Sequence, residues 1–461
     1  MDNKQERTLA KDAPSLTNKE ILLKGWVKTR RDHGKLIFLD LWDRSGLIQM
    51  VVNAKVSLEA YETARQLRPE FVIEVLGKVN KRPENAVNKN LPTGEVEVEV
   101  LKINVLAKAQ TLPFDMGQET LDLELPTLLD YRSLTLRHPK IKEIFRVQEV
   151  IIDAFRDALR EKDFTEFQAP VIIPQTAEGG AEIFAVNYFG QKAYLAQSPQ
   201  FYKQIMVGVY ERVFTVNKTL RAEPSVTTRH LTEVTTLDAE MGFIDSWEEI
   251  MDMVEYTIQY VFERVRKDAW QSLESHEASL PKISKRIPRV KLRDAQEIIF
   301  KRTGVDHRKE PDLMPEDERE ITRWAKDEHD SELVFVTHYP VSKRPFYTYE
   351  DPKDPGYTLS FDLIGRGTEW LTGGQRINDF ETLIEKAKER GVDLKKSELY
   401  LQAFRFGLPP EGGFSFGSER ITMHILGLSN VREASLFPRD MERIDTRFSF
   451  LDEEKKPENK K

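Results

Sequence analysis

The sequence predicts an α+β protein with two domains of different character. With 461 residues, the chain is long enough for more than one domain. Residues 20–107 form a succession of short segments that are rich in β-branched and apolar residues and separated by turns. From residue 141 onward, segments with helical periodicity alternate with strand-like segments.

Composition excludes several kinds of function. The chain has no cysteine, which excludes disulfides, zinc–cysteine sites and thiol catalysis, and favours a cytoplasmic setting. The net charge of −8 argues against a protein that coats nucleic acid through its overall charge. No run approaches the ~20 apolar residues of a membrane span, and the first residues lack an apolar signal core, so we expect no membrane contact.

The first domain, residues 1–107, has the pattern of a small barrel. Asp43–Gly46 and Leu91–Gly94 carry turn residues, and residues 55–67 read as a helix after the third strand. Five strands with a helix at that place are typical of an OB-type barrel, a common binder of single-stranded nucleic acid. The expected strands are Ile21–Lys28, Leu36–Trp42, Leu47–Asn53, Phe71–Asn80 and Val96–Val105.

The second domain, residues 141–451, is predicted to be a large α+β domain on a mostly antiparallel sheet. Prolines interrupt residues 108–140, which we interpret as a hinge. Residues 268–335 are highly charged and read as a surface insertion. The tail, residues 452–461, has the composition of a disordered segment.

A charged loop between two expected strands, Leu220–Glu233, suits a polyphosphate. It places Arg221, Arg229 and His230 around Glu223. Arginines bind phosphate oxygens in bidentate fashion, and carboxylates hold the metal ion that shares the phosphate charge. A solvated charged hairpin is the alternative interpretation.

Two later segments carry matching chemistry. Gly412–Arg420 combines glycines, which let the backbone approach a ligand, with an arginine that opens a helix and suits phosphate. Glu369 and Thr372 offer carboxylate and hydroxyl oxygens to Mg²⁺. Plain structural turns are the alternative for both segments. The chain has no P-loop motif, so it is not a P-loop enzyme.

A fourth segment lies upstream of the charged loop. The glycine pair after Glu178 suggests a mobile lid. Lys203 stands early in an apolar helical stretch, where an unpaired cation is costly. An anionic partner explains its place, and an exposed helix lysine is the alternative.

Together the four segments resemble the motifs of class II aminoacyl-tRNA synthetases, in the subgroup that activates aspartate, asparagine and lysine. Their order and spacing match over nearly the whole chain, as far as Phe437–Asp440. The resemblance implies an OB-fold anticodon-binding domain and a class II antiparallel-sheet catalytic domain, in a homodimer. Residues 141–161, read as a helix, and 164–173, read as a strand, resemble the dimer-forming motif of the family.

Within this family, Lys203 and Arg376 favour aspartate, because a buried carboxylate needs paired cations. In asparagine-specific relatives the lysine position tends to be acidic. The runs Gln197–Lys203 and Leu436–Asp440 also resemble the aspartate-specific type. An asparagine-specific enzyme and a non-catalytic RNA-binding paralogue are the alternatives.

The resemblance implies roles for individual residues. Arg221, Glu223 and Arg420 would be catalytic, and Glu369, Thr372 and Glu223 would hold Mg²⁺. The residues implied to bind ATP are Arg221, Glu223, Arg229, His230, Leu231, Glu369, Gly417 and Arg420. Those implied to bind aspartate are Glu178, Gln200, Lys203, Arg221 and Arg376.

Three positions depart from the family pattern. Val234 stands where several relatives carry a phenylalanine against adenine. Thr372 replaces the usual serine but keeps the hydroxyl, and Glu411 stands where a histidine is frequent. We expect these changes to tune the site.

The barrel is expected to bind the tRNA anticodon. Phe38 would stack on a base, Gln49 would bind the central uracil, and Arg30 would contact the backbone or the first base. A barrel-core residue is the alternative for Phe38. His33 and Pro83 resemble the relaxed forms that charge both tRNA(Asp) and tRNA(Asn), so we expect a non-discriminating enzyme.

Overall fold

The computed structural model describes residues 6–176, 183–224, 227–283 and 286–453, and the chain divides into two compact units, Met1–Asp122 and Leu123–Lys461. The boundary falls inside the 108–140 segment. Helices in its second half already belong to the second unit, which therefore begins before residue 141. A hinge role for this segment stays a prediction. Within the described residues, no helix has both the length and the apolar character needed to cross a bilayer.

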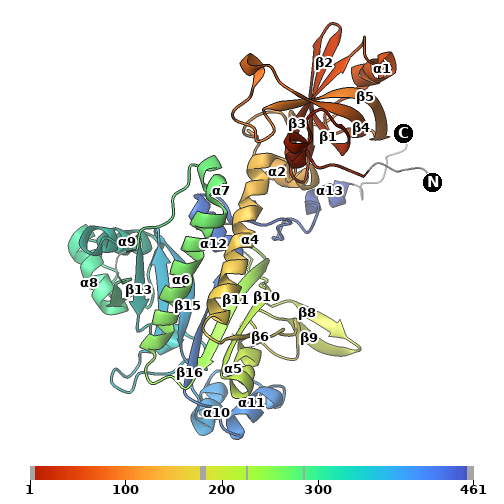
Figure 1. Cartoon of the computed structure of the whole chain (residues 1–461). Helices are drawn as coiled ribbons and strands as arrows, with labels where there is room; N and C mark the ends of the chain where they lie inside the picture. Colours follow the sequence, from red (N-terminus) through yellow and green to blue (C-terminus); the bar gives the residue numbers. More distant parts are fainter. Residues whose placement is uncertain (1–5, 177–182, 225–226, 284–285, 454–461) are drawn as a thin grey trace, which may run out of the picture. The chain divides into compact units, whose positions relative to one another are not determined.

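The first unit is a closed barrel in the order β1-β2-β3-β5-β4, with α1 between β3 and β4, which confirms the OB-type prediction (Figure 1). Alternation along the strands fills the barrel, because Ile37 and Leu39 are buried while Phe38 between them is only partly covered. The Ser57 side chain caps α1 by accepting a hydrogen bond from the Ala60 amide. The elements are β1 (Glu20–His33), β2 (Leu36–Asp43), β3 (Gly46–Asn53), α1 (Leu58–Gln66), β4 (Val72–Lys81) and β5 (Val96–Ala107).

An eight-stranded sheet forms the centre of the second unit, in the order β12-β13-β14-β15-β16-β11-β10-β6. Neighbouring strands are antiparallel except for the β12–β13 and β6–β10 pairs, which confirms the mostly antiparallel prediction. The strands are β6 (Thr165–Glu166), β10 (Arg212–Leu220), β11 (Glu233–Gly242), β12 (Arg289–Lys291), β13 (Leu333–Thr337), β14 (Ser360–Gly365), β15 (Thr368–Gln375) and β16 (Glu411–Gly417). A separate small sheet contains β7 (Ile172–Ile173), β8 (Ala185–Tyr188) and β9 (Gln191–Leu195).

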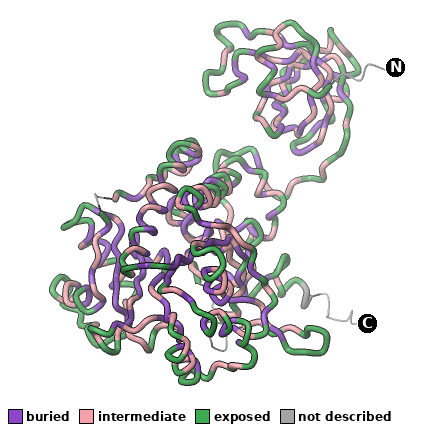
Figure 2. Tube along the Cα trace, turned by 60° about the horizontal axis from the view of Figure 1, so that its bottom comes forward, coloured by how far each residue is buried: buried purple, intermediate pink, exposed green. Residues whose placement is uncertain are grey.

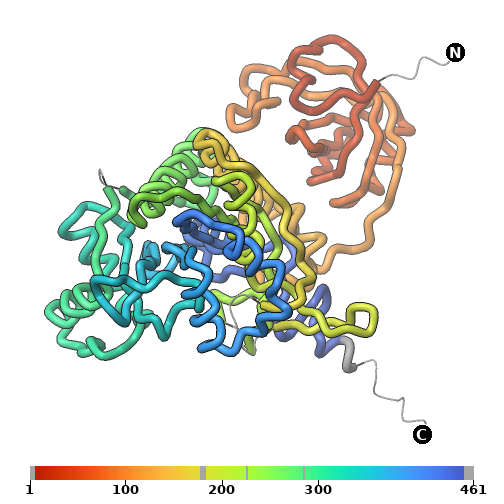
Figure 3. The backbone as a smooth tube through the Cα atoms, turned by 90° about the horizontal axis from the view of Figure 1, so that it is seen from below, coloured from red at the N-terminus to blue at the C-terminus, as the bar shows by residue number. Residues whose placement is uncertain are grey.

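Helices cover this sheet and close its core. In Figures 1 and 3, α4 and α6 lie side by side over one face, and they also contact each other. The inward side of α4 buries Val147, Ile151 and Phe155. Figure 2 shows buried positions, in purple, along the strands beneath the helices. The helices are α2 (Leu125–Asp130), α3 (Arg132–Thr135), α4 (Pro139–Arg160), α5 (Gln200–Tyr210), α6 (Glu248–Asp268), α7 (Trp270–Ser275), α8 (Leu292–Thr303), α9 (Pro315–His329), α10 (Phe380–Glu389), α11 (Glu398–Arg405), α12 (Ser418–Leu426) and α13 (Phe448–Glu453).

Two segments differ from their predicted form. The strand expected over 164–173 is two short strands in different sheets, β6 and β7, separated by a stretch that contains Pro170, which has no N–H to donate. The charged segment 268–335 is more than a surface insertion, because it supplies β12 and most of β13 to the main sheet. Its helices α8 and α9 bury apolar faces against these strands, while their charged faces dominate the composition.

Candidate active site

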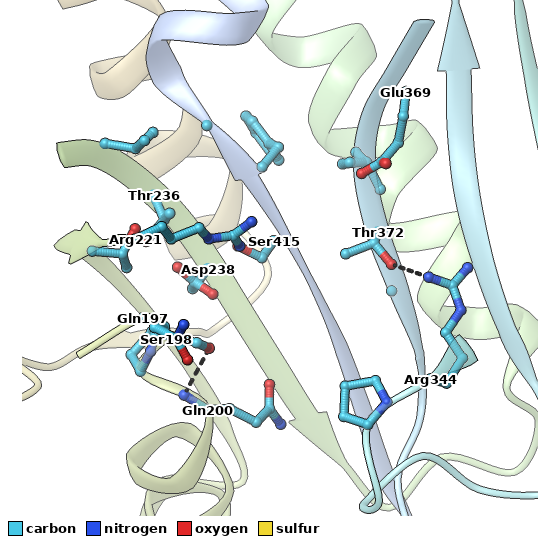
Figure 4. A pocket seen from close by; sticks show the side chains of 18 of the residues that line it. Gln197, Ser198, Gln200, Arg221, Thr236, Asp238, Arg344, Glu369, Thr372 and Ser415 are labelled. Atoms are coloured by element: carbon cyan, nitrogen blue, oxygen red, sulfur yellow. Dashed lines mark hydrogen bonds between the residues drawn. The ribbon is translucent and has the colours of Figure 1, made fainter. Parts of the chain in front are cut away.

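One pocket in the second unit brings together the catalytic-domain residues predicted from the sequence. Strand β16 runs between β11 and β15, and Figure 4 shows Thr236 and Asp238 on β11 and Thr372 on β15, on opposite sides of the pocket. Glu178 lies outside the described residues. The predicted residues that line the pocket are Gln200, Lys203, Arg221, Glu223, Arg229, His230, Leu231, Glu369, Thr372, Arg376, Gly417 and Arg420.

The charged loop connects β10 to β11 at one side of the pocket. The Arg221 amide donates to the Thr232 carbonyl at 2.9 Å, which ties the two ends of the loop together. The Arg221 guanidinium is half-exposed and lies 3.7 Å from Glu223, and His230 Nε2 lies 3.2 Å from the same carboxylate. The Arg221 and Arg229 side chains of this loop therefore line the pocket, and the hydrogen bond between Arg221 and Thr232 fixes the two ends of the loop.

Arg229 in this loop has a partner that sequence reasoning missed. Its Nη1 donates to Glu318 Oε2 of α9 at 3.2 Å. Burial raises the pKa of Glu318 to about 7, although Arg229 opposes that rise. No local signal distinguishes Glu318 from the many solvated charges of the 268–335 segment.

The opposite side of the pocket has the chemistry of a metal and phosphate site. Arg420, in the first turn of α12, has its guanidinium 3.8 Å from the Glu369 carboxylate. The Thr372 hydroxyl accepts a hydrogen bond from Arg344 at 3.3 Å, which Figure 4 marks with a dashed line. Arg344, which the sequence analysis did not single out, also pairs with Asp362 at 2.8 Å. Two arginines thus contact the oxygen donors on this side of the pocket.

These donors fit a magnesium ion that is shared with a nucleotide. Desolvation in the pocket and the nearby Asp362 carboxylate raise the pKa of Glu369. A bound cation would lower that pKa again, because it favours the charged carboxylate. Carboxylate and hydroxyl oxygens are hard ligands of the kind that Mg²⁺ takes. Among the described residues, no group of three or more His, Cys, Asp or Glu could hold a metal ion. A Mg²⁺ ion here would therefore need phosphate oxygens and water to complete its coordination.

The inner end of the pocket holds two buried cations. Lys203 is only 1% exposed, which excludes the surface-lysine alternative, and its Nζ lies 3.1 Å from both Asp238 Oδ1 and Glu240 Oε2. Arg376 Nε donates to Glu240 Oε1 at 2.8 Å, and its Nη2 donates to the Gly413 carbonyl at 3.1 Å. The anionic partner that the position of Lys203 required is thus already present in the protein.

The buried charges at the inner end of the pocket shift the pKa values of Glu240 and Lys203. Burial alone would raise the pKa of Glu240, but Arg376 and Lys203 outweigh it and hold that pKa well below its usual range. Burial would likewise lower the pKa of Lys203, but Glu240 and Asp238 raise it. The sequence carried a signal for the two acids, because they alternate with buried Leu237, Ala239 and Met241 on one strand.

Comparison with known proteins identifies the family. Residues 124–441 match the model of "tRNA synthetases class II (D, K and N)", and residues 21–106 match an "OB-fold nucleic acid binding domain". The chain belongs to the class II tRNA synthetases. The synthetase is 40% identical to an aspartate–tRNA(Asp/Asn) ligase from Thermus thermophilus, over 95% of this chain and 99% of the relative.

Other relatives show the breadth of the resemblance. An aspartate–tRNA(Asp) ligase from Pyrococcus abyssi is 37% identical to the synthetase over 93% of this chain and 97% of the relative. The crystal structure of an asparaginyl-tRNA synthetase from Pyrococcus horikoshii, complexed with asparaginyl-adenylate, has a TM-score of 0.86 at 32% identity. It covers 95% of this chain and 99% of that chain.

The barrel of the synthetase gathers several of the predicted anticodon residues on one face. Phe38 is paired across strands with Arg31 and Val51, and Asp40 with Gln49, so Phe38 and Gln49 share the outer face. This excludes the core-residue alternative for Phe38. The His33 ring lies edge-on to Phe38 with centroids 5.5 Å apart.

Arg30 and Pro83 stand apart from this group. Arg30 points to the other side of β1, where its guanidinium donates to the Arg65 carbonyl at 2.8 Å. Arg31, which was not singled out as a site residue, shares the face of Phe38. Pro83 is exposed just after β4, next to Arg82, whose charge acts on Glu97. Glu97 in turn accepts a hydrogen bond from Gln49 at 3.4 Å.

Proposed function

We propose that the synthetase is an aspartate–tRNA ligase, which activates L-aspartate with ATP and transfers it to the 3′ end of tRNA(Asp) and also of tRNA(Asn). The observation that carries the choice of amino acid is the pair of buried cations, Lys203 and Arg376, at the inner end of the pocket. A carboxylate that leaves water for this site needs such partners. The names of the relatives from T. thermophilus and P. abyssi, both aspartate ligases, support the same choice.

In this proposal the activation step needs no protein nucleophile. The aspartate α-carboxylate attacks the α-phosphorus of ATP, an acyl phosphate bond forms, and pyrophosphate leaves. Arg221 holds the α-phosphate and the attacking carboxylate together, and Gln200 with Glu178 receives the α-ammonium group. Positioning and charge neutralisation supply the rate enhancement.

The polyphosphate is held from both sides of the pocket. Arg420 binds the γ-phosphate, with Arg229 and His230 nearby. Glu369, Thr372 and Glu223 would hold Mg²⁺, directly or through water, and a bound ion would supply charge neutralisation for the phosphates. A phosphate at Arg229 would compete with Glu318, to which Arg229 is paired at 3.2 Å. In the second step the terminal hydroxyl of the tRNA attacks the aspartyl carbonyl, and AMP leaves.

The relaxed choice of tRNA rests on the barrel. The proposed anticodon face is the outer face of the barrel that carries Phe38 and Gln49. His33 packs on Phe38, and Pro83 follows β4. The T. thermophilus relative is named for both tRNAs, whereas that of P. abyssi is named for one. Aspartylation of purified tRNA(Asp) and tRNA(Asn) in separate reactions tests the proposal. We expect both to be charged, and negligible charging of tRNA(Asn) would refute the relaxed specificity.

Two observations favour asparagine as a second candidate substrate. The fold is similar to that of an asparaginyl-tRNA synthetase, and Asp238 and Glu240 already balance the charges of Lys203 and Arg376. Pyrophosphate exchange with each amino acid separates the candidates, and exchange with asparagine alone would overturn the proposal. The homodimer is part of the proposal as well, and sedimentation equilibrium at micromolar concentration checks it.

A further inference from the structure

A third carboxyl group lies behind the inner end of the pocket. Glu411, the first residue of β16, is fully buried, and its backbone carbonyl accepts a hydrogen bond from the Arg376 amide at 2.9 Å. Its Oε1 accepts from Gln204 Nε2 at 2.6 Å, and Gln204 in turn accepts from the Tyr400 hydroxyl at 3.0 Å. The Glu411 side chain is therefore held by Gln204 on α5, which Tyr400 on α11 holds in turn.

Glu411 and Glu240 lie on the neighbouring strands β16 and β11, and the Glu240 charge acts on the Glu411 carboxyl group. Among the described residues, no hydrogen-bond partner reaches Glu411 Oε2. The hydrogen-bond donor to Glu411 is the neutral amide of Gln204, so an ionised Glu411 would be a buried charge without a cation as its direct partner. Arg376 and Lys203 both bind Glu240 and keep it ionised. The proton consequently resides on Glu411, where burial and the Glu240 charge hold the pKa well above its usual range.

The charge balance of the cluster shows why this proton matters. Among the described residues, the main charged and titratable groups around Glu411 are Lys203 on α5, Asp238 and Glu240 on β11, Arg376 after β15, and Tyr400 on α11. Tyr347 lies against Arg376. Two cations and two carboxylates cancel while Glu411 is neutral. Ionisation of Glu411 adds a third negative charge in a site without bulk water, beside the cations intended for the substrate.

We infer that Glu411 is a positioning residue for amino-acid selection: its proton allows a carboxylate side chain to bind at Lys203 and Arg376, and loss of the proton selectively weakens aspartate binding. This inference rests on the proposed function, in which those two cations receive the aspartate side chain. Glu411 itself touches no substrate, since it acts through Glu240 and Arg376. Arg221 and Arg420, which would bind the nucleotide, are paired with Glu223 and Glu369 and not with Glu240, so we expect the KM for ATP to stay unchanged.

The Glu411→Gln variant tests the inference. Its amide oxygen can accept from Gln204 as the protonated acid does, and the side chain has no titrating group. The KM values for aspartate and ATP are measured by pyrophosphate exchange between about pH 6.5 and about pH 9. In the wild type, the KM for aspartate rises relative to the variant by up to about tenfold per pH unit once Glu411 ionises.

The control is Glu255→Gln, which neutralises another buried carboxyl group with a raised pKa, on α6. It keeps the wild-type pH profile. Parallel aspartate profiles in the wild type and Glu411→Gln overturn the inference, as does a matching rise in the KM for ATP. Aspartate-dependent exchange by the wild type near neutral pH tests the proposed function separately. Its absence, with asparagine active, refutes both.

If the Glu411→Gln variant does not fold, a measurement on the wild type alone still tests the inference. Calorimetry of aspartate binding in two buffers of different ionisation enthalpy reports proton uptake. We expect uptake to grow toward one proton per site at alkaline pH, because binding restores the proton on Glu411. ATP binding shows no such growth. A constant proton count for aspartate across the range contradicts the inference.

Discussion

Arg376 Nε donates to Glu240 Oε1 at 2.8 Å, with both groups almost completely removed from solvent. Glu240 also binds Lys203, so one carboxylate joins the two cations at the inner end of the pocket. If either cation is removed, the buried Glu240 carboxylate keeps only one of its two positively charged partners. The residues that select the amino acid are for this reason also part of the folded core.

Replacement of Lys203 by alanine is expected to affect both stability and aspartate use. Asp238 and Glu240 would remain buried without their shared partner, at a cost of about 3–5 kcal/mol. Denaturant unfolding measures this loss, and pyrophosphate exchange should show a raised KM for aspartate with little change for ATP. The matched control is Lys218→Ala on β10, where a half-exposed lysine pairs with Glu233 and contributes less than about 1 kcal/mol. Equal stability of the two variants contradicts this account of the cluster.

Replacement of Arg221 by alanine should remove activation without loss of stability. The side chain is half-exposed and makes only a 3.7 Å ion pair with Glu223, so its removal leaves no buried group unpaired. Loss of one preorganised charge at the transition state lowers kcat by roughly 10²–10³. Exchange kinetics measure the effect. Arg323→Ala, an exposed arginine on α9, is the control, and an unchanged kcat in Arg221→Ala refutes the role given to Arg221.

The pocket residues could be predicted from the sequence because they belong to short segments whose order along the chain resembles that of a known family. Arg221, Glu369 and Arg420 each stand in a short run with recognisable chemistry, and the structure brings these runs to one pocket. The partners of Lys203 could not be assigned in the same way. Asp238 and Glu240 are more than thirty positions away, and only the packing of α5 against β11 brings them into contact.

The face of a strand was harder to predict than the strand itself. Strict alternation from buried Val27 would point Arg30 outward with Phe38. A register shift between Val27 and Thr29 changes the alternation, so that Arg31 takes that face instead. Nothing in the local sequence marks this shift. The predicted strand Ile21–Lys28 lies within β1, which continues through Arg30 to His33. The anticodon role of Arg30 stays a prediction.

Thr372 offers a test of the metal site that leaves the fold intact. Thr372→Ser keeps the hydroxyl and should need the same Mg²⁺ concentration for half-maximal exchange as the wild type. Thr372→Val keeps the shape but removes the oxygen, which also leaves Arg344 without one acceptor. Loss of a ligand or of its support typically costs about 10–100-fold in metal affinity. Titration of exchange with Mg²⁺ measures this, and identical curves for the two variants rule out a ligand role for the hydroxyl.

The outer face of the barrel makes a separate prediction about tRNA. Phe38→Ala should raise the KM for tRNA by about 5- to 150-fold, because stacking on an aromatic ring contributes about 1–3 kcal/mol per base. Arg31→Ala should also raise this KM, since Arg31 lies beside Phe38. Arg30→Ala is the matched control, because its side chain points to α1 and should leave tRNA binding nearly unchanged. Aminoacylation kinetics give the three KM values, and pyrophosphate exchange without tRNA should be the same in all variants. A larger effect from Arg30 than from Arg31 would place the anticodon on the other side of β1.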